Sequence, residues 1–192
     1  MTAPVVGVGC LRDAGRMRFT HELGGGFRLA LRTLDTVEEM HALTLANLER
    51  LRRWEPWALY DQTLEGTAAF TRAELADFAA GSVLPTVIMS GDALVGSASL
   101  RTNSYTQTAE LGYWIDAAAE GRGAVTRACV ALLTEVRSRG IRRVEIRTAV
   151  ENKRSSRVAE RLGFTCEGVL ASALPLGDER LDVAVYGRTF AR

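Results

Sequence analysis

The 192-residue sequence predicts one α/β domain in which a mixed sheet packs against helices. Three observations support this prediction: helix-like periodicity dominates the first part, strands alternate with helices in the second, and no internal repeat or low-complexity linker divides the chain. A chain of this length forms one well-packed domain, whereas two domains would each be small. We therefore expect a single domain over residues 1–192, with residues 1–15 as a loose N-terminal segment.

Composition and charge exclude several classes of function. The apolar fraction of 47% and the charged fraction of 24% are ordinary for a globular protein, and the net charge of +1 provides no electrostatic basis for binding nucleic acid or a membrane surface. No apolar run approaches the roughly 20 residues of a transmembrane helix, and the N-terminus lacks the pattern of a signal peptide. We expect a cytoplasmic protein that binds neither nucleic acid nor membranes.

The cysteines predict neither a disulfide framework nor a metal site. Cys10, Cys129 and Cys166 are odd in number and scattered, and His21 and His41 do not cluster with them. We expect buried or idle thiols in a reducing compartment, and no metal.

Two strands and a capped helix are predicted at the start of the domain. Residues 16–23 and 27–34 have strand composition on either side of a glycine turn. Asp35, with Glu38 three residues later, resembles a capping box that opens a helix. Pro56 would end this helical region.

A second helix is predicted over residues 66–81. Its inward candidates are the large apolar side chains of Phe70, Leu75 and Phe78. Gly81 is suited to ending it.

The remainder of the chain predicts strands alternating with helices. A Gly-Asp turn between residues 83–90 and 93–101 indicates a hairpin, and residues 108–116 form a third strand. The next strand, residues 142–150, places Val144, Ile146 and Thr148 on one face. The last predicted elements are a helix over 152–163 and strands over 164–170 and 181–190.

The stretch EGRGAVTRACVALL places a glycine loop directly before an amphipathic helix. The apolar stripe of that helix consists of Val125, Ala128, Cys129, Leu132, Leu133 and Val136. Backbone N–H groups at a helix start have no internal partner, and glycines let a ligand approach them. Gly121 and Gly123 therefore make either a phosphate site or a simple tight turn. Walker and dinucleotide motifs fit poorly, because no lysine follows and position 126 is threonine.

An ordered set of segments resembles the GNAT superfamily of N-acetyltransferases, in particular its ribosomal-protein N-terminal branch, the RimJ/RimL type. The segments are NLERLRRWEPW, AELGYWIDAAAEGRGAVTRA, VEIRTAVENKRSSRVAERLGFTCEGVL and DVAVYGRTF, within residues 26–190. The resemblance implies a mostly antiparallel sheet with central splayed parallel strands and flanking helices. It also implies acetyl-coenzyme A as co-substrate, direct transfer to an amine in a ternary complex, and a homodimer.

The resemblance assigns coenzyme-binding roles to the glycine loop and the parallel strands. The family's pyrophosphate loop, usually [Q/R]-x-x-G-x-[G/A], falls on Glu120 to Val125, and its amides are those of Gly121, Arg122, Gly123, Ala124 and Val125. Backbone groups of Trp114, Ile115 and Asp116 would pair with the pantetheine arm. Asn152 matches the family's pantetheine-binding asparagine, and it also suits a helix N-cap. Glu120 departs from the family pattern, and we expect its carboxylate to turn to solvent, away from the pyrophosphate.

Catalytic roles follow from the same resemblance. Many relatives use a tyrosine seven residues after the asparagine, where this chain has Ala159, whereas the RimJ/RimL branch has N-x-x-S. Ser155 matches that serine and is the candidate to hydrogen-bond, or relay a proton to, the leaving thiolate. Glu110 is the candidate base for the amine. The acceptor site would be walled by Trp54, Glu55 and Trp57, with Tyr186 as a further acceptor-side residue.

Several alternatives remain open at the level of sequence. Ser155 could be an ordinary first-turn residue, Glu110 a solvated carboxylate, and the tryptophans part of the core. The acceptor could be a protein N-terminal α-amino group or a small-molecule amine; an α-amino group keeps more of its neutral form at neutral pH than a lysine does. A larger donor such as succinyl-coenzyme A, or a non-catalytic module that binds acyl-coenzyme A, are the alternative functions.

Overall fold

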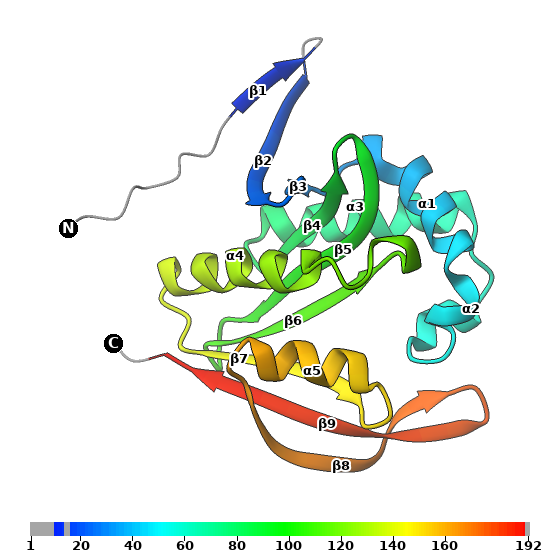
Figure 1. Ribbon diagram of the computed structural model, residues 1–192, viewed down its shortest axis with the longest axis vertical. Coiled ribbons are helices and arrows are strands. Elements are labelled where there is room, and N and C mark those ends of the chain that lie inside the picture. The colour runs from blue at the N-terminus through cyan, green and yellow to red at the C-terminus, as the bar shows by residue number, and fades with distance from the viewer. Residues whose placement is uncertain (1–9, 14–15, 191–192) are drawn as a thin grey trace.

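The computed structural model describes residues 10–13 and 16–190. Among these residues, nine strands are neighbours in the order β1-β2-β3-β4-β5-β6-β7-β9-β8 (Figure 1). Their bounds are β1 Cys10–Asp13, β2 Arg16–Gly24, β3 Phe27–Leu31, β4 Val83–Ser90, β5 Ala93–Asn103, β6 Thr108–Ile115, β7 Arg143–Ala149, β8 Thr165–Leu176 and β9 Glu179–Thr189. Only β6 and β7 pair in parallel; every other neighbouring pair is antiparallel. The predicted mixed, mostly antiparallel sheet is confirmed.

Helices cover both faces of this sheet. Their bounds are α1 Val37–Ala46, α2 Leu48–Leu51, α3 Leu64–Ala79, α4 Ala124–Ser138 and α5 Lys153–Arg161, with short 3-10 helices η1 Leu34–Thr36, η2 Pro56–Leu59 and η3 Ala117–Ala119. Helices α4 and α5 lie on the near face in Figure 1, and α3 lies behind the sheet. No helix among the described residues is long and apolar enough to cross a membrane.

The stripe of α4 supplies much of the main core. Its fully buried residues are Ala124, Ala128, Cys129, Leu132, Leu133 and Val136. The prediction is correct except at one end, where Ala124 is buried and Val125 is only partly so.

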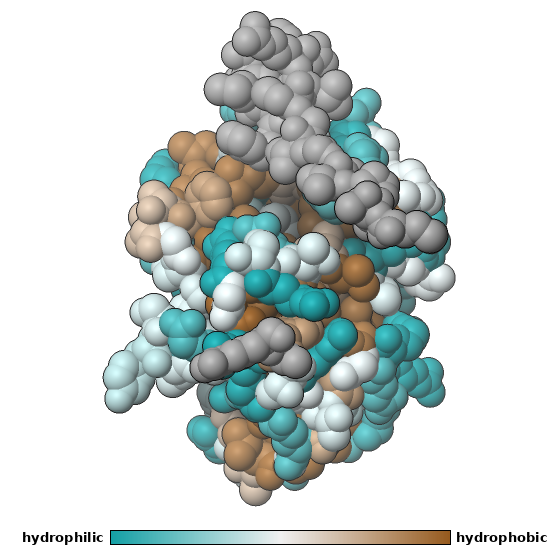
Figure 2. Space-filling view, turned by 90° about the vertical axis from the view of Figure 1, so that its left-hand side faces the viewer, coloured by the Kyte–Doolittle hydropathy of each residue, from teal (hydrophilic) through white to brown (hydrophobic). Residues whose placement is uncertain are grey.

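On the side at the left of Figure 1, hydrophilic residues cross the middle of the surface, with apolar residues above and below them (Figure 2).

The two parallel strands separate soon after they begin. Their paired register runs from Thr108 opposite Arg143 to Glu110 opposite Glu145, and no pairing continues beyond it. Strand β6 continues to Ile115, and Figure 1 shows β6 and β7 moving apart. The facing edges of both strands therefore carry backbone groups that the sheet does not pair, which confirms the expected splay.

The N-terminal part of the chain differs from prediction in two places. Residues 1–9 and 14–15 of the expected loose segment lie outside the described residues, but Cys10–Asp13 forms β1, which pairs with β2. The first helical region starts at η1, before Asp35. There the Thr33 amide donates to the Thr36 hydroxyl over 3.3 Å, so these two threonines form a capping box two residues before the predicted one.

The buried face of α3 is polar, which the apolar pattern could not indicate. Phe70 is 52% exposed and Phe78 36%, whereas Thr71 and Glu74 are buried. The reason is hydrogen bonding across the sheet face: Arg32 Nε donates to Thr71 Oγ1 over 2.9 Å, and Glu74 pairs with an arginine of β5. The prediction of inward-facing phenylalanines was therefore wrong.

Gly96 lies where β5 leaves no room for a side chain. A Cβ there would lie 2.5 Å from the Trp114 carbonyl oxygen and 3.0 Å from the Ile115 Cα, and both atoms belong to the backbone of β6. We expect Gly96→Ala to lower the free energy of unfolding by about 1–3 kcal/mol, measured by urea denaturation. A Cβ at Gly168 meets nothing within 4 Å, so Gly168→Ala is the matched control. Equal stability of both variants would contradict this account.

Candidate active site

Two cavities meet where β6 and β7 separate. The strand cavity, about 780 Å³, lies along β5, β6 and β7 and is also lined by residues of η2 and α3. The loop cavity, about 890 Å³, lies along the glycine loop and α5. Six residues line both cavities: Trp54, Glu55, Tyr113, Trp114, Asn152 and Ser155. We call this set of six shared residues the junction.

The glycine loop opens into the loop cavity. Gly121 and Gly123 have φ values of +73° and +78°, which favour glycine, and Gly123 is the N-cap of α4. Residues Gly121 and Gly123 to Thr126 line the cavity, so the unpaired first amides of α4 face a space that an anion could enter. Arg122 does not line it, because its guanidinium lies 4.7 Å from the centre of the Phe27 ring.

The Glu120 carboxylate is held by two arginines. Arg50 Nη2 contacts Oε1, and Arg154 Nη1 lies 2.7 Å from Oε2. The Glu120 side chain is 28% exposed, so the prediction that it turns to solvent was wrong. An acid that would repel a phosphate is neutralised locally by cations from α2 and α5.

A buried asparagine between α1 and α2, Asn47, connects Arg50 of this ion pair to the start of η3. Asn47, 3% exposed, donates from Nδ2 to Asp116 Oδ1 over 3.0 Å. Its Oδ1 accepts from Arg50 Nη1 over 2.9 Å and from the Ala117 amide over 3.1 Å. Asn47 thereby fixes Arg50 beside the loop. Sequence reasoning missed both residues, since nothing in the helical pattern distinguishes them from surface polar residues.

Strand alternation decides which backbone groups face the open splay. The Asp116 amide donates to the Val95 carbonyl over 2.7 Å, and its own carbonyl accepts from the end of η3. In an antiparallel pair, residues two apart point the same way, so Trp114 also directs its backbone to β5. Ile115 points in the opposite direction, toward the space that β7 has left. Of the three expected pantetheine-binding residues, Ile115 fits, whereas Trp114 and Asp116 do not.

The start of α5 brings Ser155 to a tyrosine hydroxyl. Asn152 Oδ1 accepts from the Ser155 amide over 3.2 Å, which makes Asn152 the N-cap and leaves its Nδ2 as the donor for a bound molecule. The Tyr113 hydroxyl donates to the Ser155 carbonyl over 3.2 Å and lies 3.1 Å from Ser155 Oγ, where either hydroxyl can be the donor. Burial raises the pKa of Tyr113, so the phenol stays protonated.

Sequence reasoning missed Tyr113 as well. The available signal was its position on the face of β6 opposite Glu110, because successive strand residues point to opposite faces of the sheet. Only the tertiary structure brings α5 over that face.

The expected acceptor-side residues divide into two groups. Trp54 lies at the junction, Trp57 and Glu110 line the strand cavity, and Trp57 Nε1 donates to Glu55 Oε2 over 3.0 Å. Burial raises the pKa of Glu55. Tyr186 is only 6% exposed, belongs to the main core and lines neither cavity, so its prediction as an acceptor-side residue was wrong.

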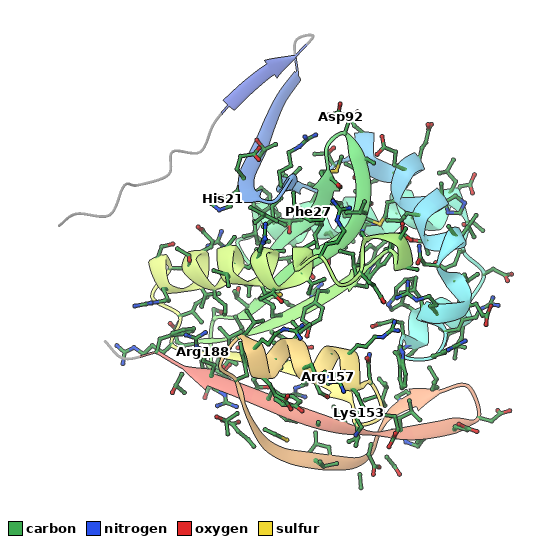
Figure 3. The ribbon with its side chains drawn as sticks, in the orientation of Figure 1. His21, Phe27, Asp92, Lys153, Arg157 and Arg188 are labelled. Carbon is green, nitrogen blue, oxygen red and sulfur yellow. The ribbon has the colours of Figure 1, made fainter. Side chains whose placement is uncertain are left out.

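The two cavities differ in charge. The cationic side chains of the loop cavity are Arg50, Arg53, Lys153, Arg154, Arg157 and Arg161, and its carboxylates are Glu55, Glu120 and Glu151. Figure 3 shows Lys153 and Arg157 along α5. In the strand cavity Glu74 is paired with Arg101 and Arg147 with Glu145, which leaves the carboxylates of Glu55 and Glu110 beside the guanidinium of Arg32. The loop cavity therefore suits a polyanion, and the strand cavity suits a cation such as an ammonium.

The described thiols are not placed to accept an acyl group. Cys129 is fully buried, and burial raises its pKa, so the thiol stays protonated. Cys166 is exposed on β8, and neither cysteine lines a cavity. The side chain of Cys10 lies outside the described residues. This arrangement favours direct transfer between two bound substrates.

Comparisons with known proteins agree with this geometry. A model of the acetyltransferase (GNAT) domain family matches residues 28–165. The ribosomal-protein-serine acetyltransferase of Escherichia coli (strain K12) is 32% identical over 154 residues, which are 79% of this chain and 86% of that protein. The structure of RimL, a ribosomal L7/L12 α-N-protein acetyltransferase, in complex with coenzyme A has a TM-score of 0.85 at 27% identity, covering 88% of this chain and 97% of that chain. The microcin C7 self-immunity acetyltransferase MccE, in complex with acetyl-CoA and AMP, has a TM-score of 0.83 at 27% identity, covering 88% and 94%.

Proposed function

We propose that this chain, which belongs to the GNAT acetyltransferase family, acetylates the N-terminal α-amino group of a protein, with ribosomal proteins as the acceptor class. Its activity is that of an acetyl-coenzyme A-dependent N-acetyltransferase. The observation that carries the acceptor proposal is the strand cavity, which presents the carboxylates of Glu55 and Glu110 and joins the basic loop cavity at the junction. A ribosomal-protein-serine acetyltransferase among its relatives supports the acceptor class.

The residues of the loop cavity fit the coenzyme. Amides from Gly121 to Val125 would bind the pyrophosphate, Ile115 would offer its backbone to the pantetheine arm, and Asn152 Nδ2 would donate to the same arm. The excess of cations over carboxylates in this cavity favours a ligand that carries several phosphate charges. This path ends at the junction, where Ser155 lies.

The proposed chemistry uses Ser155 as the donor to the departing thiolate. Tyr113 orients the Ser155 hydroxyl and supplies a second protonated group beside it. A hydrogen bond to a thiolate strengthens as negative charge develops on sulfur, so it stabilises the transition state more than the ground state. Glu110, which lines the strand cavity, is a proposed acceptor-side carboxylate.

An acceptor panel tests the function. The purified chain is mixed with acetyl-coenzyme A and peptides that begin with serine or alanine, and free thiol release and peptide mass are followed. We expect turnover with free α-amino peptides, and none with the same peptides blocked at the N-terminus and carrying a single lysine. An α-amino group has a pKa of about 7.7–8.0, so it keeps a larger neutral fraction than lysine. Turnover with the lysine peptides alone would contradict the proposal.

A small-molecule amine is the second candidate acceptor. The likeness to MccE, which was solved with AMP as well as acetyl-CoA, favours it. The aromatic rings of Trp57 and Phe70 in the strand cavity could stack on a planar ring. Turnover with aminoacyl nucleotide analogues, together with no turnover of peptides, would select this alternative.

Homodimer formation and a cytoplasmic location remain predictions.

A further inference from the structure

We propose that Glu55, and not Glu110, accepts the proton of the acceptor amine. This inference rests on the proposed function. It assigns to Glu55, expected only to line the acceptor site, the role of base that the sequence analysis gave to Glu110.

Position singles out Glu55 among the carboxylates. It is the only Asp or Glu among the six described residues that line both cavities, so it stands where an acceptor amine would meet the acyl group. Ser155 lines the same junction. Glu110 lines the strand cavity alone and lies in the part of β6 that still pairs with β7, with Glu145 as its register partner. The reacting groups therefore meet beside Glu55 and beyond Glu110.

The backbone and side chain of Glu55 are both held. Its amide donates to the Leu51 carbonyl over 2.8 Å, and its carbonyl accepts from the Ala58 amide over 3.0 Å. Pro56 follows, which restricts the chain further. Trp57 Nε1 donates to Oε2, which leaves Oε1 for another donor. A carboxylate fixed in this way can present one oxygen to an ammonium group with little loss of conformational freedom.

The negative charge of the Glu55 carboxylate is not neutralised by an ion pair among the described residues. No described lysine or arginine forms an ion pair with Glu55, whereas Glu74, the third carboxylate of the strand cavity, pairs with Arg101 over 2.6 Å. Burial raises the pKa of Glu55, which brings it closer to the pKa of an α-amino group and makes proton transfer between them less uphill.

The proton balance is simple. The acceptor enters as an ammonium ion, and Glu55 takes one proton from it and passes that proton to solvent. The neutral nitrogen attacks the thioester carbonyl carbon, so a C–N bond forms and the C–S bond breaks. The nitrogen loses a second proton, and the leaving sulfur gains one through the Ser155 hydroxyl, which ends as it began. The products are the amide, coenzyme A thiol and one proton in solution.

The test compares three glutamate-to-glutamine variants in an assay with an N-terminal serine peptide. We expect Glu55→Gln to lower kcat about tenfold without changing the Kd for acetyl-coenzyme A, because a neutral fraction of the amine still reacts. Glutamine keeps an oxygen that can accept from Trp57. Glu49→Gln is the matched control, since Glu49 is exposed on α2, pairs with Arg53 and lines neither cavity. Glu110→Gln should lower kcat less than Glu55→Gln.

Chemical rescue separates proton transfer from structure. In Glu55→Ala, added formate should restore part of the lost kcat. Glu55→Asp should retain more activity than Glu55→Ala or Glu55→Gln. A loss of kcat in Glu110→Gln with full activity in Glu55→Gln would overturn the proposal, as would the absence of formate rescue. If the wild-type protein acetylates no free α-amine, the proposed function fails first, so wild-type turnover distinguishes the two failures. If the Gln and Ala variants lose coenzyme binding, Glu55→Asp is the test: a lowered kcat with an unchanged Kd for acetyl-coenzyme A supports the proposal, and an unchanged kcat overturns it.

Discussion

Ser155→Ala is expected to lower kcat about 100-fold while the affinity for acetyl-coenzyme A stays unchanged. The substitution removes one hydroxyl that would donate to the departing thiolate, and loss of a single donor to developing charge costs about this much. The start of α5 should survive, because Asn152 caps it through the Ser155 backbone amide, which alanine retains. A change in kcat without a change in Kd is therefore the expected signature.

Thiol release under saturating substrates measures this effect. Ser156→Ala is the matched control: Ser156 is the next residue of α5, is buried, and lines neither cavity. Tyr113→Phe removes the hydroxyl that lies 3.1 Å from Ser155 Oγ while keeping the ring, and should give a smaller loss than Ser155→Ala. If Tyr113→Phe is the more damaging variant, the phenol and not the serine is the principal donor.

Most of the fold could be predicted because its elements carry local signals. The stripe of α4 follows helical spacing, and Val144 and Ile146 alternate on β7 as a half-buried strand requires. The capping role of Asn152 is also local, because its oxygen reaches an amide three residues later. The inward face of α3 could not be predicted in this way. It depends on Thr71 and Glu74, whose partners are Arg32, the residue after β3, and Arg101 of β5, and only the folded chain brings these near.

In the candidate active site, the residues that act through their backbone could be predicted from the sequence. The residues that act through side-chain contacts with other elements could be predicted less well. Gly121 and Gly123 were found because the loop conformation restricts their residue type. The direction of the Arg122 side chain could not be predicted in this way, because its guanidinium contacts the Phe27 ring, which is far away in sequence. Asn47 and Tyr113 were missed for the same reason: their partners lie on other elements.

Arg50→Ala is expected to weaken coenzyme A binding about 30-fold, or about 2 kcal/mol. Arg50 is fixed by Asn47, so it can meet a phosphate with little loss of side-chain freedom. Its removal also leaves Glu120 with one remaining partner, Arg154, whose side chain is 75% exposed. The loop would lose an attraction and gain a repulsion together. Isothermal titration at two salt concentrations measures the Kd for coenzyme A and its salt dependence. Arg72→Ala, at an exposed position of α3, is the control.

Glu120→Gln should act in the opposite direction and tighten coenzyme binding. The carboxylate competes with the phosphates for both arginines, and Arg50 would keep its contact with Asn47 after Glu120 is neutralised. The gain should shrink as salt rises, because mobile ions screen the exposed Arg154 more than the half-buried Arg50. Weaker binding in Glu120→Gln would instead mean that the carboxylate orients the arginines. In that case the acid at the start of this loop would be a structural support for Arg50 and Arg154, the two cations beside the loop.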